Sequence, residues 1–517
     1  MSVDKDFVLS ALLQYNFLPT QKRAREEVPP IYTSVAFTPG VAKKLVAGKK
    51  RKSDGYHGFD AVDYKLTRFN GVSRSCSIPH PTPYASLAIA IHEHWDKLEY
   101  ITTNKNSYIR PRTHSDGRLI IMDYERSFEA TRRTLVKAFG RRFMVHTDIA
   151  NCFPSVYSHA LPWAAVGFAH AKKHKSPKHS GEWFNVLDLK LRSMKRGETQ
   201  GVAIGPATSN IVSEAILARI DETLSKEFLY VRFIDDYTAY CTNEDQAQEF
   251  IRRLSQELAA CKMLLNINKT AILPLPQALS NNWTSELSLA LPRGGPISGS
   301  AASSFLTLAM RIANDVPDGS VHKYALKALI RSDLSYWAAN DVLRYGIMLA
   351  YHQPVLIPLL GELFERTLLG PSFGWGSELQ EIALENAKSG RSDGMVWTVH
   401  YLNRYSVKVS TEVADAILAS RDCLALLTLY LSEDPVHQTK VIAFAKNLDA
   451  SDLYELDQYW MLLYHLFREG KIPSPYADED GFEIMRDEGV TFVQNDTADL
   501  PALGAKNLER MLKEIFA

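Results

Sequence analysis

Two hydrophobic periodicities divide the chain. Before about residue 290, apolar residues form short runs of strand length, such as FMV at 143–145, YVRF at 230–233 and YTAY at 237–240. After residue 300, apolar residues recur every three or four positions over long segments, for example at 341–369 and 411–431. Short apolar runs favour strands, and the longer period favours helices. We therefore expect an α+β front part and an all-α back part.

The boundary between these parts is the stretch LPRGGPISGS at 291–300, whose Pro, Gly and Ser residues interrupt regular elements. We expect an N-terminal segment at 1–100, a second domain at 101–290 and a C-terminal domain at 300–517. In the C-terminal domain, short polar connectors between helical segments predict stacked antiparallel helix pairs. The segments show no fixed repeat period.

Charge divides the chain at the same place. Residues 1–300 hold 40 Lys and Arg against 29 Asp and Glu, and residues 301–517 hold 19 against 30, although the whole chain is neutral. The basic runs lie at 41–52, 110–118 and 171–180. Each run by itself is also typical of an ordinary solvated surface. Their clustering in one half favours a partner that carries phosphates.

Composition limits the class of protein. An apolar share of 46% and a charged share of 23% are typical of globular proteins. The chain has no apolar stretch of about 18 residues, and its N-terminus lacks the features of a secretory signal. We therefore expect a cytoplasmic protein without a membrane association. The cysteines have no paired spacing, which argues against disulfides and thiolate zinc sites; they are Cys76, Cys152, Cys241, Cys261 and Cys423.

Adjacent aspartates interrupt the apolar pattern at 230–240. Asp235 and Asp236 lie between two strand-like runs, where Asp is also a common turn residue. A second acid, Asp148, ends the predicted strand at 143–146. A strand ending in Asp beside a hairpin that carries Asp-Asp can hold two divalent cations about 3.5–4 Å apart for phosphoryl transfer. Carboxylates are the ligands that Mg²⁺ prefers, with Mn²⁺ as the alternative.

A glycine-containing loop and a helix separate these acidic elements. The loop contains Gln200-Gly201 and Gly205-Pro206, and Thr208 or Ser209 is suited to cap the following helix. An apolar stripe predicts that the helix packs in the core; it comprises Val212, Ile216, Ile220 and Leu224.

Taken in order, four short motifs resemble the palm motifs of reverse transcriptases. They are Asp148-x4-Phe153, Gln200-Gly201-x4-Pro206, Phe233-Ile234-Asp235-Asp236 and LNINKT at 265–270. Their order and approximate spacing both match, and a conjunction of linked motifs is far more specific than any one of them. The resemblance implies a fingers and palm domain over 101–290, with part of the fingers in 1–100.

The resemblance also implies roles for individual residues. Asp148 and Asp235 would be the main metal ligands, Asp236 a neighbouring acid, and the carbonyl of Ile149 a further ligand. Phe153 would lie beneath the incoming sugar and exclude a 2′-hydroxyl, so the product would be DNA. Gln200 and Gly201 would line the nucleotide pocket.

Basic residues are harder to assign. Lys269 is a candidate for the leaving phosphate, although a surface lysine is an equally good interpretation. Any of Arg110, Arg112 and Arg118 is suited to grip the triphosphate, with Arg112 the candidate retained. Phe233 stands where most reverse transcriptases have Tyr, which removes a hydroxyl and keeps the ring.

The helical, acidic back half is unlike the thumb that usually follows a palm, because an acidic surface repels a nucleic-acid duplex. With RSCSIPHPTPYASLAIAIHEHW at 74–95, this architecture resembles the abortive-infection reverse transcriptases of bacteria, most of all the prophage-borne kind of the P-two phage type. That family implies synthesis of single-stranded DNA from deoxynucleoside triphosphates without a template, primed on a tyrosine of the protein itself. It also implies a homo-oligomer and an unidentified phage component as trigger.

Three functions remain open at this point. The first is the untemplated, protein-primed polymerase of phage defence. The second is a conventional RNA-templated reverse transcriptase, and the third is a catalytically silent sensor that resembles a polymerase. His170, His174 and His179 lie near helical spacing and are a further candidate metal cluster, although their Lys-rich segment favours an ordinary surface over a metal site.

Overall fold

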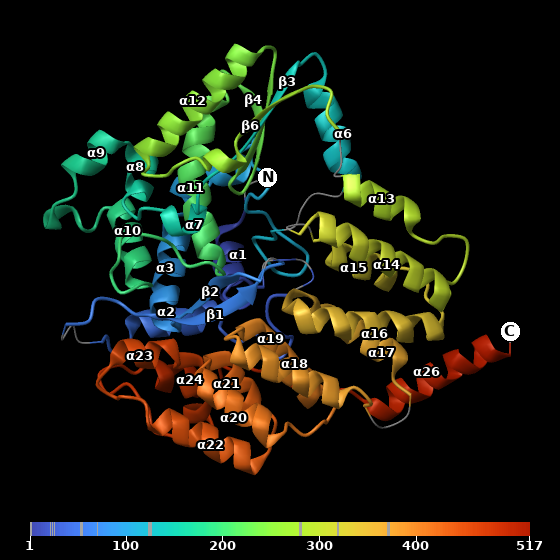
Figure 1. Ribbon diagram of the computed structural model, residues 1–517. Helices are drawn as coiled ribbons and strands as arrows, with labels where there is room; N and C mark the ends of the chain where they lie inside the picture. The colour runs from blue at the N-terminus through green and yellow to red at the C-terminus, as the bar shows by residue number, and fades with distance from the viewer. Residues whose placement is uncertain are drawn as a thin grey trace.

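A four-stranded antiparallel sheet carries all three aspartates (Figure 1). A computed structural model describes residues 3–20, 22, 24, 26–51, 55–69, 71–122, 127–278, 282–317, 320–369 and 373–516, without the side chains of 127, 128 and 177. The strand order is β4-β5-β3-β6. The bounds are Phe143–Asp148 for β3, Leu229–Phe233 for β4, Asp236–Cys241 for β5 and Ala271–Pro274 for β6. The predicted hairpin and the predicted strand before Asp148 are both confirmed.

Two long helices cover one face of this sheet. Helix α12 (Glu244–Ala260) packs against β3, β5 and β6, and α11 (Ala207–Leu224) packs beside α12. Nearly every residue of α11 is buried, which is typical of a helix enclosed on all sides. The predicted cap is wrong: Pro206 is the N-cap, so Thr208 and Ser209 lie inside the helix. Proline needs no backbone N–H there, and its fixed φ starts the helix earlier.

The first hundred residues link the sheet region to the helical half. They form α1 (Lys5–Ser10), η1 (Ala11–Tyr15), α2 (Pro39–Ala47), the hairpin of β1 (Ala61–Thr67) and β2 (Ser73–Pro79), α3 (Pro81–Glu93), α4 (Trp95–Leu98) and α5 (Tyr100–Thr103). Asp393 accepts hydrogen bonds from the backbone N–H and the hydroxyl of Thr67 at 2.7 and 2.8 Å. The Trp460 indole donates to the carbonyl of Ile78 at 3.1 Å. Hairpin β1–β2 is therefore fixed against the C-terminal helices.

Shorter helices surround the loop regions of the sheet domain. They are α6 (Ser127–Ala138), α7 (Cys152–Ser155), α8 (Ala160–Val166), α9 (Phe168–Lys173), η2 (Pro177–His179), α10 (Trp183–Ser193) and η3 (Ile267–Lys269). Helix α10 packs against both α3 and α8. These helices support the segments on either side of the acidic strand ends.

The described residues after 300 are helical, with no named strand among them, which confirms the predicted all-α back part. Helix α13 (Asn282–Ala290) precedes this part, whose helices are α14 (Gly299–Asp315), α15 (Val321–Ile330), α16 (Tyr336–His352), η4 (Pro354–Leu359), α17 (Leu360–Thr367), α18 (Gly376–Lys388), α19 (Ser392–Arg404), α20 (Thr411–Ser420), α21 (Cys423–Tyr430), α22 (Pro435–Lys446), α23 (Leu453–Gln458), α24 (Trp460–Arg468), α25 (Gly481–Asp487) and α26 (Leu500–Ile515). Consecutive helices pack in pairs, for example α14 with α15 and α18 with α19.

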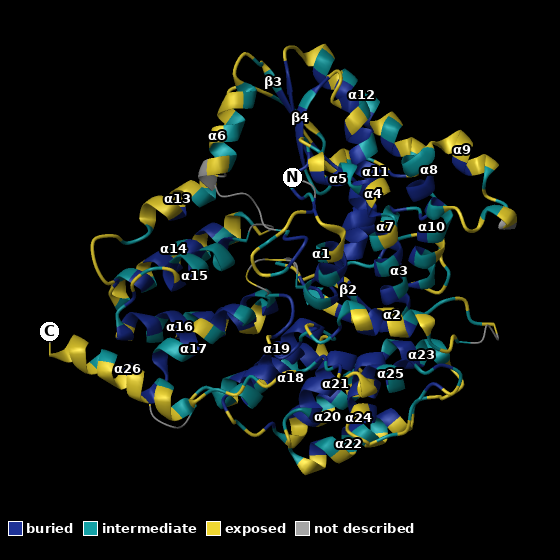
Figure 2. Cartoon of the chain, turned by 180° about the vertical axis from the view of Figure 1, so that it is seen from behind, coloured by how far each residue is buried: buried dark blue, intermediate teal, exposed yellow. Residues whose placement is uncertain are grey.

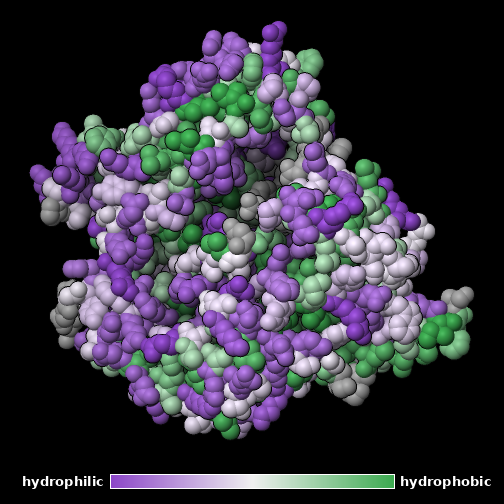
Figure 3. All heavy atoms as spheres, in the orientation of Figure 1, coloured by the Kyte–Doolittle hydropathy of each residue, from purple (hydrophilic) through white to green (hydrophobic). Residues whose placement is uncertain are grey.

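Buried residues run without interruption from the N-terminal segment into the helical half (Figure 2). An aromatic cluster lies at this junction: the ring of Phe17 is 4.7 Å from Tyr84, 5.7 Å from Phe492 and 6.1 Å from Trp460. Hydrophilic and hydrophobic residues are interspersed on the face shown in Figure 3. Within the described residues, every helix is too short or too polar to cross a membrane.

Candidate active site

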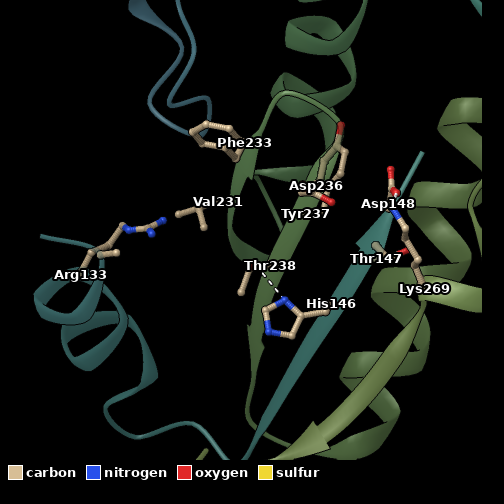
Figure 4. A pocket seen from close by; sticks show the side chains of 11 residues that line it. Arg133, His146, Thr147, Asp148, Val231, Phe233, Asp236, Tyr237, Thr238 and Lys269 are labelled. Carbon is tan, nitrogen blue, oxygen red and sulfur yellow. Dashed lines mark hydrogen bonds and ion pairs between the residues drawn. The ribbon is translucent and has the colours of Figure 1, made fainter. Parts of the chain in front are cut away.

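The antiparallel pairing of β3 and β5 brings the acidic motifs together. Asp148 ends β3 and lies opposite Asp236, the first residue of β5 (Figure 4). The N–H of Ile149 donates to the carbonyl of Asp235 at 3.2 Å, which ties the hairpin turn to the end of β3. Three carboxylates separated by nearly ninety positions in sequence therefore share one end of the sheet.

The turn that presents Asp235 is strained and is held from behind. Ile234 has a φ of 58°, in the left-handed region that a β-branched residue rarely adopts. Its carbonyl accepts a hydrogen bond of 2.8 Å from Nη1 of Arg232. Arg232 is fully buried and pairs with Glu214 and Asp221 of α11, each at 2.7 Å. This network was not predicted from the sequence, where its signal is an arginine inside an apolar strand.

The carboxylates destabilise one another's charges. Burial and the charges of Asp148 and Asp236 raise the pKa of Asp235 to about 6. Burial and the charge of Asp148 also raise the pKa of Asp236. Such mutual repulsion is expected where a site is built to hold cations.

One ammonium group faces the carboxylates. Nζ of Lys269 lies 2.5 Å from Oδ2 of Asp148, and this hydrogen bond raises the pKa of Lys269. The other oxygen of Asp148, Oδ1, is buried and has no hydrogen-bond partner among the described residues. A buried carboxylate oxygen without a donor is costly unless a cation neutralises it.

These side chains suit a divalent cation in their chemistry. As the described side chains stand, no three His, Cys, Asp or Glu residues converge closely enough to enclose a metal ion. The ammonium of Lys269 already places one positive charge beside Asp148. The unpartnered Oδ1 of Asp148 and the raised pKa of Asp235 favour binding of a further cation. The donor set consists of hard oxygens, as Mg²⁺ requires. The ligand roles of Asp148, Ile149, Asp235 and Asp236 stay predictions.

The loop with Gln200 and Gly201 is fixed to the short helix of Phe153. The amide of Gln200 donates to the carbonyls of Pro154 and Ser155, both at 3.1 Å. Gly201 has a φ of 84°, and a Cβ there would lie 3.2 Å from the carbonyl oxygen of Pro154. Phe153 is buried, and its carbonyl accepts from the N–H of Val202 at 3.0 Å. The structure thus brings these predicted residues together, one turn beyond Asp148.

The three candidate arginines lie in different environments. Arg118 is buried, and its guanidinium pairs with Asp116 at 2.7 Å and donates to the carbonyls of Thr20 and Lys22. These contacts occupy its donors. Arg110 donates to the carbonyl of Asn104 at 3.1 Å. Arg112 is exposed, and its assignment to the triphosphate remains a prediction.

A further arginine was missed in the sequence. Burial and the charges of Asp148 and Asp236 raise the pKa of Asp235. Arg74 on β2 is near enough for its positive charge to oppose this rise. Its Nε is buried and has no hydrogen-bond partner among the described residues. Hairpin β1–β2 brings Arg74 to the site across a long sequence separation, and no local pattern in the sequence indicates this.

A cavity of about 380 Å³ borders the carboxylates on the open face of the sheet (Figure 4). Its lining includes Arg133, His146, Phe233, Thr238 and Lys269. Nδ1 of His146 lies 3.1 Å from the hydroxyl of Thr238. The cavity is large enough for a small polar substrate group beside Asp148 and Asp236.

The histidines of the Lys-rich segment do not form a metal centre in the described residues. The rings of His170 and His174 stack with centroids 4.1 Å apart, and His179 lies edge-on to His174 at 4.7 Å. They pack as aromatic rings on the surface around α9.

Comparison with known proteins supports the palm assignment. Residues 97–283 match the family model described as reverse transcriptase (RNA-dependent DNA polymerase). The matched segment contains Asp148, Phe153, Gln200, Asp235 and Asp236. The chain therefore contains a reverse transcriptase domain, and the predicted fold class is confirmed. No curated protein matches the chain.

Some solved structures show a distant likeness. Apo telomerase from Candida tropicalis is 12% identical, with a TM-score of 0.33, over 68% of this chain and 70% of that one. A form of it truncated from the C-terminal domain is 15% identical, with a TM-score of 0.31, over 47% of this chain and 55% of that one. This chain thus spans about half the length of the truncated form.

Proposed function

We propose that this chain is a DNA polymerase of the reverse-transcriptase type that adds deoxynucleotides without a template. In this proposal, a tyrosine of the protein itself primes the synthesis, and the single-stranded DNA product stays covalently attached. The activity would serve abortive infection in response to a phage component. The observation that carries the polymerase assignment is the cluster of Asp148, Asp235 and Asp236, which concentrates negative charge at the end of two paired strands.

The reaction would be a displacement at the α-phosphorus of a deoxynucleoside triphosphate. A tyrosine hydroxyl, or later the 3′-hydroxyl of the growing strand, forms the new P–O bond, the bond to the β-phosphate oxygen breaks, and pyrophosphate leaves with its electron pair. Two bound Mg²⁺ ions would supply charge neutralisation and lower the pKa of the attacking hydroxyl. Asp148 and Asp235 would hold these ions, with Asp236 and the Ile149 carbonyl beside them.

The remaining residues would bind and orient the nucleotide. The ring of Phe153 would exclude a 2′-hydroxyl, while Gln200 and Gly201 fix the segment that carries it. The guanidinium groups of Arg74 and Arg112 and the ammonium of Lys269 would meet the phosphate oxygens.

The acidic helical half supports template-independent synthesis. Residues 301–517 carry 30 acidic against 19 basic residues, and the regular elements among their described residues are helices. A surface of this sign repels the phosphates of a template–product duplex. We expect instead that these helices mediate assembly into a homo-oligomer. The conventional alternative, RNA-templated synthesis, is favoured by the matched family model, whose description is RNA-dependent DNA polymerase.

The deciding experiment incubates the purified chain with Mg²⁺ and labelled deoxynucleoside triphosphates, with no template or primer. Products are separated on a denaturing gel before and after protease treatment. We expect label that migrates above the protein band and collapses after proteolysis. Label that appears only after template RNA and primer are added would instead establish the templated alternative. No incorporation under either condition would favour a catalytically silent sensor.

The sugar gate has its own test. Phe153→Ala should admit ribonucleotides, because the ring that would collide with a 2′-hydroxyl is gone. Incorporation of ribonucleotides and deoxynucleotides is compared in both proteins. Cys152→Ala is the matched control, since Cys152 is the adjacent buried residue of α7. Continued rejection of ribonucleotides by an active Phe153→Ala protein would remove Phe153 from this role.

A further inference from the structure

A second cavity, about 580 Å³ in volume, lies where α2 and the described residues 50, 51 and 56–59 meet α3 and α10. We call it the α3–α10 cleft. Helices α2, α3 and α10 pack side by side in the molecule (Figure 1). The described lining residues between Leu45 and Ser86 lie outside the segment matched by the reverse transcriptase model, and those between Leu189 and Gly197 lie inside it. The N-terminal segment therefore creates this cleft.

The described lining residues of the cleft include no acidic side chain. Five of them are Lys or Arg, namely Lys50, Arg51, Lys190, Arg192 and Arg196, and His57 lies beside them. The three arginines are held by carboxylates: Arg51 lies 2.7 Å from Asp457, Arg192 lies 3.3 Å from Asp188, and Arg196 pairs with Asp60. These pairs fix the guanidinium groups in the walls.

The two lysines differ from the arginines. Lys50 and Lys190 have no carboxylate within ion-pair distance among the described residues. Burial and the positive charge of Lys50 lower the pKa of Lys190, while Glu93 opposes this shift. Two ammonium groups that repel each other in a cavity whose described lining has no acidic residue favour the binding of anions.

Polar and aromatic groups complete the cleft. Oγ1 of Thr82, in the first turn of α3, is buried and has no hydrogen-bond partner among the described residues. The ring of Tyr56 forms part of the lining, and its hydroxyl donates to the carbonyl of Ser451 at 2.9 Å, which fixes the ring. A channel with cationic groups, a free hydroxyl and a fixed aromatic ring is typical of sites for single-stranded nucleic acid.

The cleft is joined directly to the candidate active site. The loop 195–201 connects Arg196 and Gly197 in the cleft wall to Gln200 and Gly201 beside Phe153. Nζ of Lys195 donates to the carbonyl of Gln200 at 3.1 Å within this loop. A strand that occupies the cleft therefore lies within a few residues' reach of the nucleotide pocket.

We propose that the α3–α10 cleft binds the phosphodiester backbone of a single nucleic-acid strand, with Lys50 and Lys190 each contacting a phosphate. The fixed ring of Tyr56 in the lining favours a single strand, whose unpaired bases are free to stack on it. The site is separate from the carboxylate cluster. Its binding can be measured without nucleotide addition, so it does not depend on the proposed polymerase activity.

The test measures fluorescence anisotropy of fluorescein-labelled 20-mers of oligo(dT) and oligo(U) with the full chain, without triphosphates and in EDTA. Lys50→Gln/Lys190→Gln should weaken binding by about tenfold and reduce the slope of log K against log salt by about 1.4, or about 0.7 for each lost phosphate contact. Lys388→Gln/Lys446→Gln removes two exposed charges from the helical half and should change neither. Tighter binding of one oligonucleotide identifies DNA or RNA as the strand.

Equal affinity and salt slope in Lys50→Gln/Lys190→Gln and the unmodified chain would overturn the proposal. Photocrosslinking gives a second measurement. An oligo(dT) that carries 5-iododeoxyuridine should crosslink to a peptide containing Tyr56. Crosslinks confined to the palm strands would count equally against the cleft. These measurements contain no triphosphates. Failure of the cleft proposal would therefore leave the proposed DNA synthesis untouched.

Discussion

The hairpin of β4 and β5 carries two clusters of charge that are built in opposite ways. At the base of the turn, Arg232 is fully buried between Glu214 and Asp221, and each of the three finds an opposite charge. At the tip, Asp235 and Asp236 face Asp148. Among the described residues, Lys269 is the cation in direct contact with Asp148. The two clusters are separated by only two positions along the chain.

The difference separates a structural charge from a functional one. Removing one partner from a buried, neutralised network leaves an uncompensated charge and costs stability. Carboxylates that repel each other reduce stability and are retained where they bind something, here the proposed cations. The base of the hairpin should therefore control folding, while the tip should control chemistry. Each prediction below separates these two effects.

The largest effect is expected at the tip. Asp235→Ala/Asp236→Ala should reduce deoxynucleotide incorporation by at least about 10⁴-fold, since cation binding accounts for several kcal/mol of transition-state stabilisation. The melting temperature in EDTA should stay the same or rise, because a source of repulsion is removed. Incorporation and thermal unfolding are measured on the same preparation. Undiminished synthesis would refute the metal-site assignment.

A smaller effect, on stability, is expected at the base. Arg232→Ala leaves Glu214 and Asp221 buried without their partner and should lower the free energy of unfolding by about 3–5 kcal/mol. Chemical denaturation checks this. Arg252→Ala is the control, because it breaks an exposed pair with Glu249 on α12 and should leave stability nearly unchanged. A stable but inactive Arg232→Ala protein would show that the base acts on the site itself.

The pH dependence of stability should distinguish the tip directly. The pKa of Asp235 rises from 3.8 to about 6 on folding, so the folded state binds the proton more tightly. Without Mg²⁺, the contribution of Asp235 to the free energy of unfolding is fully present below about pH 3.8 and falls as the pH rises towards 6. Above that pH the free energy of unfolding stays lower by at most about 3 kcal/mol. The unfolding free energies of the unmodified chain and of Asp235→Asn are measured from pH 4 to 7.5 in EDTA. The difference between them should follow this pH dependence.

Two additions sharpen the pH experiment. Mg²⁺ should restore stability above pH 6 in the unmodified chain and not in Asp235→Asn, because the cation binds the ionised form. Glu479→Gln serves as a reference, since burial raises the pKa of Glu479 to about 7 at a position far from the hairpin. Its profile should lie at higher pH and be indifferent to Mg²⁺. A profile for Asp235→Asn that matches the unmodified chain would contradict the repulsion at the tip.

The sequence predicted the tip of the hairpin far better than its base. Asp148, Asp235 and Asp236 follow strand-like runs, and strand alternation with turn chemistry is a local signal that places them at strand ends. Arg232 finds its partners on α11, 11 and 18 positions earlier, and only the packing of a helix on a sheet brings them together. Arg74 reaches Asp235 through the β1–β2 hairpin, across an even longer separation.

The same distinction between local signals and long-range packing explains where else the predictions and the structure differ. Thr208 and Ser209 have good capping chemistry, yet Pro206 starts the helix first. The stretch 291–300 is visible in composition and contains the connection between α13 and α14, and the domain boundary expected there stays a prediction. The packing of β1–β2 against the C-terminal helices is not visible, because contacts such as Thr67 with Asp393 join residues more than three hundred positions apart.

The smallest effect is expected at Lys269, which has properties of both a structural charge and a functional one. Its ammonium neutralises Asp148 at 2.5 Å, as a structural partner would, yet its side chain is 64% exposed and free to move away when a cation binds. Lys269→Met should therefore lower the Mg²⁺ concentration needed for half-maximal incorporation, because the competing cation is gone. The maximal rate should fall by about tenfold, because a donor to the leaving phosphate is lost. Lys262→Met, on the same connection between α12 and β6, is the control. If the Mg²⁺ requirement and the rate both stay unchanged, Lys269 is an ordinary surface lysine, and the carboxylates at the tip bind their cations without competition from the chain.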